Sequence, residues 1–294
     1  MKAQLKYSFK KEKALFVRRY HLLGMLLGIF GFAIMNPLLC KAMDSMMKIA
    51  NEMEFPTQTA AVSMASGGVS GAAGLESMMS MFQSASFSLG YTFSQIISYS
   101  LLIIMLVTRS AAGGEQRKRT MIVPMCSGLQ YKNYLIPKFV IYPLSTLVLT
   151  FLGGMMAGGF CNALFTVDRV SFDMIAFGSL IMAVYCAFII TIYLALGVCT
   201  SRPGLMTGAV YLGQMILPSF LDAMGLSDYQ PFMLVSAASS MFMLGKEYGL
   251  SDRLPSILTA MGLCVVISVL MYFLARGVLG AKKIDNTEED KPAF

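Results

Sequence analysis

The sequence is poor in charge: only 13% of its 294 residues are Asp, Glu, Lys or Arg, and 56% are apolar. A soluble globular domain carries about 25% charged residues, so this chain lacks the side chains that would cover a water-facing surface. That scarcity excludes a soluble enzyme or a soluble binding module. It also leaves several long charge-free runs, each near the ~20 residues that cross a bilayer as a helix. The composition predicts an integral membrane protein.

Histidine and tryptophan are nearly absent, with one His (His21) and no Trp. The chain has no Ser/His/Asp set and no His-Glu-x-x-His motif, which excludes most hydrolase mechanisms. We interpret His21, beside a basic segment, as an interfacial residue. The six cysteines include no Cys-x-x-Cys pair and lie mainly in or near apolar runs, so we expect buried thiols. The chain is therefore not expected to be an enzyme or to bind a metal.

Six charge-free runs predict six transmembrane helices, at 20–40, 77–108, 139–167, 174–201, 203–221 and 254–275. A seventh run, 229–245, is short and contains Pro231 and three serines, so we interpret it as a re-entrant or surface helix. A β-barrel requires strands in which polar and apolar residues alternate, and these runs do not alternate, so a β-barrel is excluded. The predicted fold class is all-α: a polytopic membrane helical bundle of six transmembrane helices, with an amphipathic N-terminal interfacial helix and re-entrant helices before the last span.

The basic residues are distributed unequally between the two sides of such a bundle. Of the 23 Lys and Arg residues, 18 fall on the side of the two termini and five on the other side. The positive-inside rule then makes both termini cytoplasmic. The net charge of +7 therefore reflects topology, and nucleic acid is not an expected partner.

We treat residues 1–294 as one transmembrane domain with five segments outside the spans. The first mixes apolar and basic residues, as an interfacial helix does, and the second begins as an amphipathic helix and continues as a Ser/Gly/Ala-rich loop. We expect the second transmembrane helix to start near residue 75, outside the membrane. The segments are a cytoplasmic interfacial helix (1–19), an extracellular segment (41–76), a cytoplasmic segment (110–138), an extracellular or re-entrant segment (222–253) and a cytoplasmic tail (277–294).

No source of energy for transport is visible in the spans. None of the six runs contains Asp, Glu, Lys or Arg, and proton- or sodium-coupled carriers usually keep such residues inside the membrane. The stretch 277–283 does not have the spacing of a phosphate-binding loop. The chain is therefore either a passive pore or is driven from outside the membrane by another protein.

The segment 110–138 carries the most specific pattern. Gly114 and Glu115 predict a helix start with an acid in its first turn, followed by Arg119, Thr120 and, before the third span, Lys138. The segment resembles the cytoplasmic coupling helix of the permease subunits of ABC-2 type (type V) ABC transporters. In that family a Glu opens the helix, a Gly-Thr pair follows and a Lys starts the third span. Arg119 stands where the family has Gly.

The resemblance implies an ATP-driven exporter whose membrane subunit binds no cofactor itself, because ATP and Mg²⁺ are held by a separate ABC ATPase. The implied partners are ATPase subunits, a second permease subunit (a homodimer or a heterodimer) and membrane lipid, in a bacterial cytoplasmic membrane. The implied ATPase-coupling residues are Gly114, Glu115, Arg117, Lys118, Arg119, Thr120, Met121 and Met125.

In the resembling family the first, second and fifth spans line the pathway between subunits. Polar side chains there also bond neighbouring helices to each other, so each has a structural interpretation as well. The implied pathway residues are Asn36, Ser94, Gln95, Tyr99, Tyr211 and Gln214. The many methionines suit a hydrophobic or amphipathic substrate, peptide or drug-like, or are core filling. The alternative function is an ATP-independent channel or a structural subunit of a membrane complex.

Overall fold

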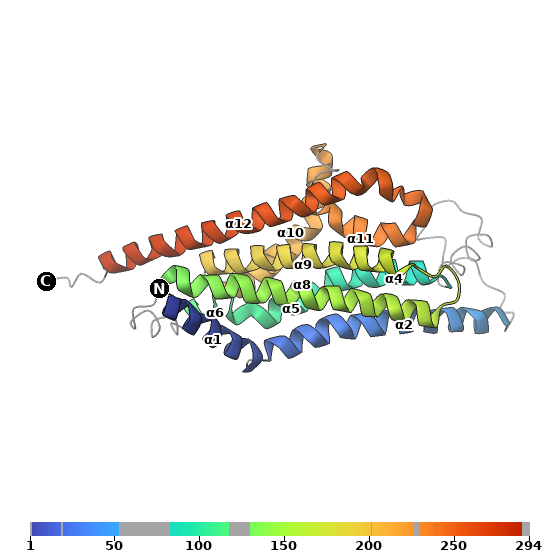
Figure 1. Cartoon of the computed structure of the whole chain (residues 1–294), viewed down its shortest axis with the longest axis horizontal. Helices are drawn as coiled ribbons and strands as arrows, with labels where there is room; N and C mark the ends of the chain where they lie inside the picture. The colour runs from blue at the N-terminus through green and yellow to red at the C-terminus, as the bar shows by residue number, and fades with distance from the viewer. Residues whose placement is uncertain are drawn as a thin grey trace.

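A computed structural model describes residues 2–18, 20–52, 83–117, 130–200, 202–225 and 230–289. These residues form an elongated helical bundle in which both chain termini lie at the same end (Figure 1). We call this the N-terminal end and the opposite one the distal end. The helices are α1 (Lys2–Arg18), α2 (His21–Glu52), α4 (Ala85–Gln95), the π-helix η1 (Ile96–Ser100), α5 (Leu101–Val107), the 3-10 turn η2 (Thr108–Ser110), α6 (Gly114–Arg117), α8 (Tyr131–Leu164), α9 (Phe172–Thr200), α10 (Pro203–Ala223), α11 (Met233–Met243), η3 (Gly245–Tyr248) and α12 (Leu250–Glu289).

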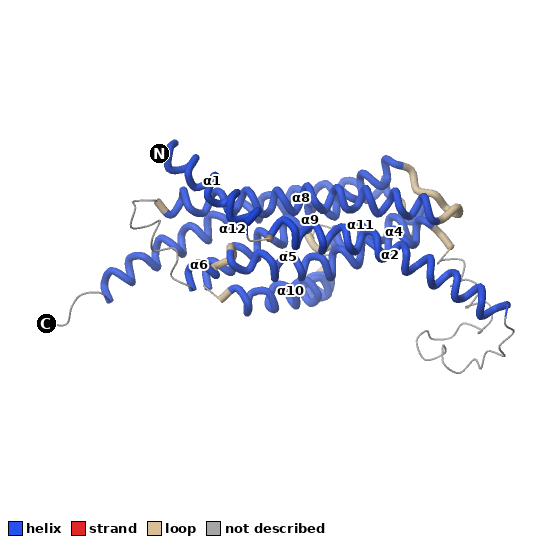
Figure 2. The backbone as a smooth tube through the Cα atoms, turned by 90° about the horizontal axis from the view of Figure 1, so that it is seen from below, coloured by secondary structure: helices blue, strands red, loops and turns tan. Residues whose placement is uncertain are grey.

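Six helical segments of the described chain are long and apolar enough to cross a membrane, which confirms the predicted number. They are His21–Met46, Ala85–Ser110, Asn133–Leu164, Phe172–Thr200, Pro203–Ala223 and Leu250–Gly280. The run predicted to be too short for a span forms the 11-residue helix α11. The described fold is thus that of a multi-pass helical membrane protein, and Figure 2 shows its described segments as helices joined by short loops.

The helix boundaries agree only in part with those that the sequence predicts. Helix α2 runs without a break to Glu52, as the amphipathic start of the segment 41–76 predicts, and Lys41 and Lys48 pair with Asp44 along one face. The second span begins at Ala85, where Ser84 caps the helix by accepting a hydrogen bond from the Phe87 N–H. The prediction of a start near residue 75 was therefore wrong.

Helix α9 is the centre of the bundle. It packs against α8, α12, α10 and α11, and 78% of its most apolar window is buried, against 17% in α10 and α12. Two glycines of α8 allow neighbouring helices to approach α8 closely. A Cβ added at Gly154 would meet the Ser179 side chain of α9, and a Cβ added at Gly153 would meet the Ile29 side chain of α2. Close approach at small residues is the usual basis of helix association in membranes.

Helices α1 and α2 meet at a sharp bend at the N-terminal end. Tyr20 has a φ of 57°, a left-handed conformation that ends one helix and reorients the next. Helix α1 therefore meets α2 at an angle and packs along α8 as well as α2. One face of α1 is buried, through Ser8, Glu12 and Phe16. This packing places a carboxylate from the start of the chain beside the third span.

Candidate functional site

A buried polar cluster occupies the N-terminal end of the bundle. Helix α8 contributes Tyr134, Lys138 and Tyr142, whose spacing of four residues puts them on one face. The short helix α6, which follows the second span, contributes Glu115, and α1 contributes Glu12. Each of these five side chains is at most 6% exposed. The cluster therefore joins α1, α6 and α8.

Lys138 is the central charge of this cluster. Its Nζ lies 2.8 Å from Glu115 Oε2, 2.8 Å from the Tyr134 hydroxyl and 3.4 Å from the Ala111 carbonyl oxygen. The three ammonium hydrogens thus have three acceptors. The Tyr134 hydroxyl in turn donates to Glu115 Oε2 at 2.6 Å. Because both charges are hydrogen-bonded as well as paired, the ion pair can persist in a site without solvent.

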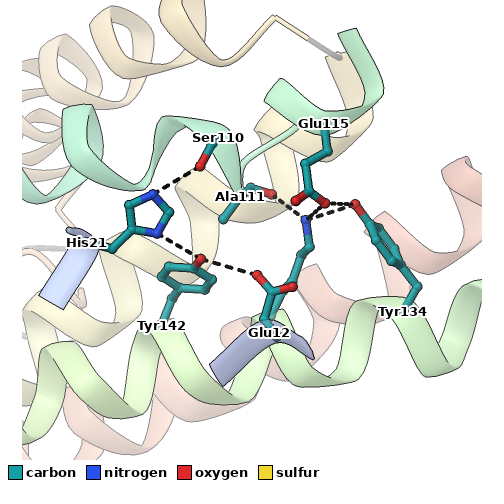
Figure 3. Close-up of polar contacts among 8 residues, drawn as sticks. Glu12, His21, Ser110, Ala111, Glu115, Tyr134 and Tyr142 are labelled. Carbon is teal, nitrogen blue, oxygen red and sulfur yellow. Dashed lines mark hydrogen bonds and ion pairs between the residues drawn. The ribbon is translucent and has the colours of Figure 1, made fainter. Parts of the chain in front are cut away.

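A second branch of the cluster runs through Tyr142 (Figure 3). Its hydroxyl donates to Glu12 Oε1 at 3.2 Å and lies 3.0 Å from His21 Nδ1. Since the single phenolic proton goes to Glu12, Nδ1 of His21 carries the hydrogen that bonds the Tyr142 oxygen. The other ring nitrogen, Nε2, lies 3.0 Å from Ser110 Oγ at the end of the second span. Four separate elements are therefore bonded through one tyrosine and one histidine.

The two carboxylates of the cluster are shifted in opposite directions. Burial by itself would raise the pKa of Glu115, but the Lys138 ammonium and the hydrogen bonds from Lys138 and Tyr134 outweigh it and lower that pKa to about 2. For Glu12, burial dominates over the more distant Lys138 charge, so its pKa is raised above 4.5. Glu115 is thus the ionised partner of Lys138.

The lowered pKa of Glu115 predicts a defined loss of stability in acid. The groups that act on this carboxylate include Lys138 and Tyr134 from α8 and the more distant Lys11 and Glu12 from α1. A depressed carboxyl pKa stabilises the fold above the unfolded value of 4.5 and loses that contribution as the pH falls towards 2. We expect the stability of the wild type relative to Glu115→Gln to decrease by about 3 kcal/mol over this range, measured by circular dichroism during thermal unfolding in detergent.

Glu12→Gln is the matched control. Because the pKa of Glu12 is raised rather than lowered, its contribution to stability changes with pH in the opposite direction. Ionisation of Glu12 opposes folding, so the stability of the wild type relative to this variant should fall as the pH rises. A wild-type advantage over Glu115→Gln that stays constant from pH 6 to pH 3 would contradict the assignment of Glu115.

The predicted coupling residues are only partly within the described chain. Helix α6 begins at Gly114, has Glu115 in its first turn and ends at Arg117. This confirms the predicted helix start. Lys138 pairs with Glu115 although 23 residues separate them. The remaining predicted residues, Lys118, Arg119, Thr120, Met121 and Met125, lie outside the described residues.

The six predicted pathway residues lie on two separate sets of helices. Asn36 is buried on α2, and Tyr99 of η1 stacks on Phe32 of α2 at 6.0 Å between ring centroids. Ser94 and Gln95 are half-buried on α4, which packs on α2, whereas Tyr211 and Gln214 lie on α10, which packs on α9 and α5. Among the described residues no hydrogen bond joins any two of the six.

Sequence reasoning missed most of the buried cluster. His21, interpreted as interfacial, is 4% exposed and bonded to two other elements. The spacing of Tyr134, Lys138 and Tyr142 by four was a usable signal, because it places three polar groups on one face of an apolar helix. No signal in the sequence connected Glu12 with that face.

Comparison of the chain with protein-family models, with curated proteins and with solved structures found no match. The fold and the site therefore have to be interpreted from the physical chemistry of the chain itself.

Proposed function

We propose that this chain is the permease subunit of an ATP-driven exporter of the ABC-2 type, which moves a hydrophobic or amphipathic substrate, peptide or drug-like, across a bacterial cytoplasmic membrane. A separate ABC ATPase hydrolyses ATP with Mg²⁺ and docks at the N-terminal end of the bundle. A second permease subunit, identical or different, completes the pathway. The helix α11 and the turn η3 are re-entrant elements before the last span.

The observation that carries this proposal is the buried ion pair between Glu115 and Lys138. An ATPase that closes on ATP can move the spans only if its docking segment is firmly bonded to them. Helix α6 is bonded in this way, because Glu115 accepts hydrogen bonds from both Lys138 and Tyr134 of the third span. Movement of α6 would therefore be transmitted to α8.

The charge distribution supports a cytoplasmic location of the N-terminal end. The exposed face of α1 carries Lys6, Lys10 and Lys13, while its opposite face packs on α8 and α2. Exposed lysines at the membrane surface suit the anionic cytoplasmic leaflet. In the proposed orientation both termini and the docking segment lie on the side where ATP is available.

Helix α10 supports a contact with a second permease subunit. One face of it is buried through Thr207, Val210 and Gln214, whereas Leu205, Leu212, Met215, Ile216 and Phe220 on the rest of the helix are 47–63% exposed. Such an apolar surface within a span contacts lipid or another helix. The fifth span is one of the three, with the first and the second, that the family resemblance places along the pathway between subunits.

Removing the charges of the docking segment should release the ATPase. We expect the triple variant Arg117→Gln, Lys118→Gln, Arg119→Gln to insert into the membrane normally. When the tagged protein is purified from its native membrane in mild detergent, the variant should retain less than about a fifth of the ATPase that the wild type retains. The reason is the loss of several charge pairs of up to ~1 kcal/mol each. The measurement is quantitative mass spectrometry of the purified complex.

The matched control is the triple variant Lys6→Gln, Lys10→Gln, Lys13→Gln, which removes the same charge from exposed positions of α1 at the same end. It should leave the recovered ATPase unchanged. A wild-type preparation that contains no ATPase would overturn the proposal in favour of an ATP-independent channel or scaffold, and equal recovery with both triple variants would overturn the docking site.

A further inference from the structure

A pocket of about 620 Å³ lies where the end of α10 meets the beginnings of α11 and α12. It is separate from the polar cluster at the N-terminal end, and its lining combines amides, hydroxyls and charges with apolar side chains. The lining residues are Gln214, Pro218, Asp222, Gln230, Phe232, Met233, Val235, Ser236, Asp252, Arg253 and Ser256. The volume is in the range of small-molecule binding sites.

The amide of Gln214 is the most informative group in this pocket. The side chain is 7% exposed, yet within the described part of the chain neither its oxygen nor its nitrogen has a hydrogen-bond partner. A buried amide without partners is costly and rare. Gln230, also 7% exposed, uses its nitrogen to donate to Asp222 Oδ1 at 2.6 Å, but its oxygen is unpartnered. Three buried polar atoms of this pocket therefore have no hydrogen-bond partner among the described residues.

The charges around these amides favour a cation. Asp222 and Asp252 each bring a carboxylate, and neither forms an ion pair with another described residue. Among the described lining residues Arg253 is the only basic one, and its guanidinium lies over the Tyr248 ring at 4.8 Å from the centroid. Two carboxylates and one guanidinium give this described part of the lining a formal charge of −1.

We propose that this pocket binds a small organic cation that has an apolar ring system and hydrogen-bonding amino groups. The carboxylate of Asp222 attracts the positive charge, and the amides of Gln214 and Gln230 bond the amino groups. Phe232, Met233 and Val235 contact the apolar part. This site does not depend on the proposed exporter function, because the binding involves one copy of this chain and no ATPase.

The test uses ethidium, a fluorescent cation with an aromatic ring system and two amino groups, titrated into the purified full chain in nanodiscs. Asp222→Asn should weaken its binding about fivefold by removing one charge interaction, and Gln214→Leu about fivefold by removing hydrogen bonds. Gln214→Glu should tighten the binding, because it adds a negative charge beside the ligand. A gain in affinity cannot result from misfolding.

Asp173→Asn is the matched control, since Asp173 is an exposed carboxylate in the first turn of α9 and does not line the pocket. It should leave ethidium binding unchanged. Binding that is equal in all variants and in empty nanodiscs would show partition into lipid and overturn the proposal. Weaker binding to Gln214→Glu than to the wild type would overturn it too, because it would show that the pocket does not hold the cation.

Discussion

Replacing Lys138 with methionine is expected to destabilise the protein by about 3–5 kcal/mol, because the change leaves a buried carboxylate without its counter-charge. Glu115 would lose the Lys138 ammonium at 2.8 Å but keep the hydrogen bond from Tyr134. The described residues include four buried free cysteines, Cys40, Cys161, Cys186 and Cys264, so unfolding can be followed with a thiol-reactive fluorophore. The thermal midpoint of the detergent-solubilised variant should fall clearly below that of the wild type.

The double variant Lys138→Met, Glu115→Gln separates an ion-pair effect from general loss of packing. With both charges removed, the unpaired carboxylate disappears, and more than half of the lost stability should return. Lys41→Met serves as the control, because Lys41 pairs with Asp44 but is 41% exposed, and such pairs contribute at most ~1 kcal/mol. A double variant as unstable as Lys138→Met alone would show that the unpaired Glu115 carboxylate is not the cause of the destabilisation.

Gly197→Ala is expected to destabilise the protein by about 1–3 kcal/mol through overpacking. Gly197 of α9 faces the backbone just before α6, and an added Cβ would lie 3.0 Å from the Ala112 carbonyl carbon and closer still to its oxygen. Backbone cannot rotate away as a side-chain tip can. The central helix would have to move from the segment that carries Glu115, and thiol exposure on heating should report this as a lower midpoint.

Gly159→Ala is the control for the effect of a methyl group in a helix. This glycine of α8 has no atom within 4 Å of an added Cβ, so the substitution should be neutral or slightly stabilising, by up to ~1 kcal/mol. Equal midpoints for Gly197→Ala and Gly159→Ala would show that the contact between α9 and Ala112 is looser than the structure indicates.

Much of the architecture could be predicted from local composition. Six runs without charge correspond to the six long apolar helices, and the short run with Pro231 and three serines forms the 11-residue helix α11. This worked because a chain in lipid must satisfy its backbone hydrogen bonds within each helix, so apolar length is read directly from the sequence. The helix start at Gly114 and Glu115 was predicted for a similar local reason, a charge at a helix terminus.

Helix boundaries were less predictable, because charge was used as a marker of helix ends. The pairs of Lys41 and Lys48 with Asp44, at spacings of three and four, are local, and the continuation of α2 past residue 41 could be predicted from them. Lys138 lies within α8, which begins at Tyr131 rather than near residue 139. Its partner Glu115 is 23 residues away in the chain, and only the arrangement of the helices brings the two together.

The sequence alone determined the class of the protein, the number of long apolar helices and the helix start at Glu115. Tertiary structure decided which polar groups meet. Tyr142 and Glu12 are 130 residues apart and His21 and Tyr142 are 121 apart, and they touch because α1 and α2, which meet at a bend at Tyr20, both pack on α8. Hydropathy is a property of each segment, whereas a buried hydrogen bond requires two segments to be placed within ~3 Å, and that placement follows from the packing of the whole bundle.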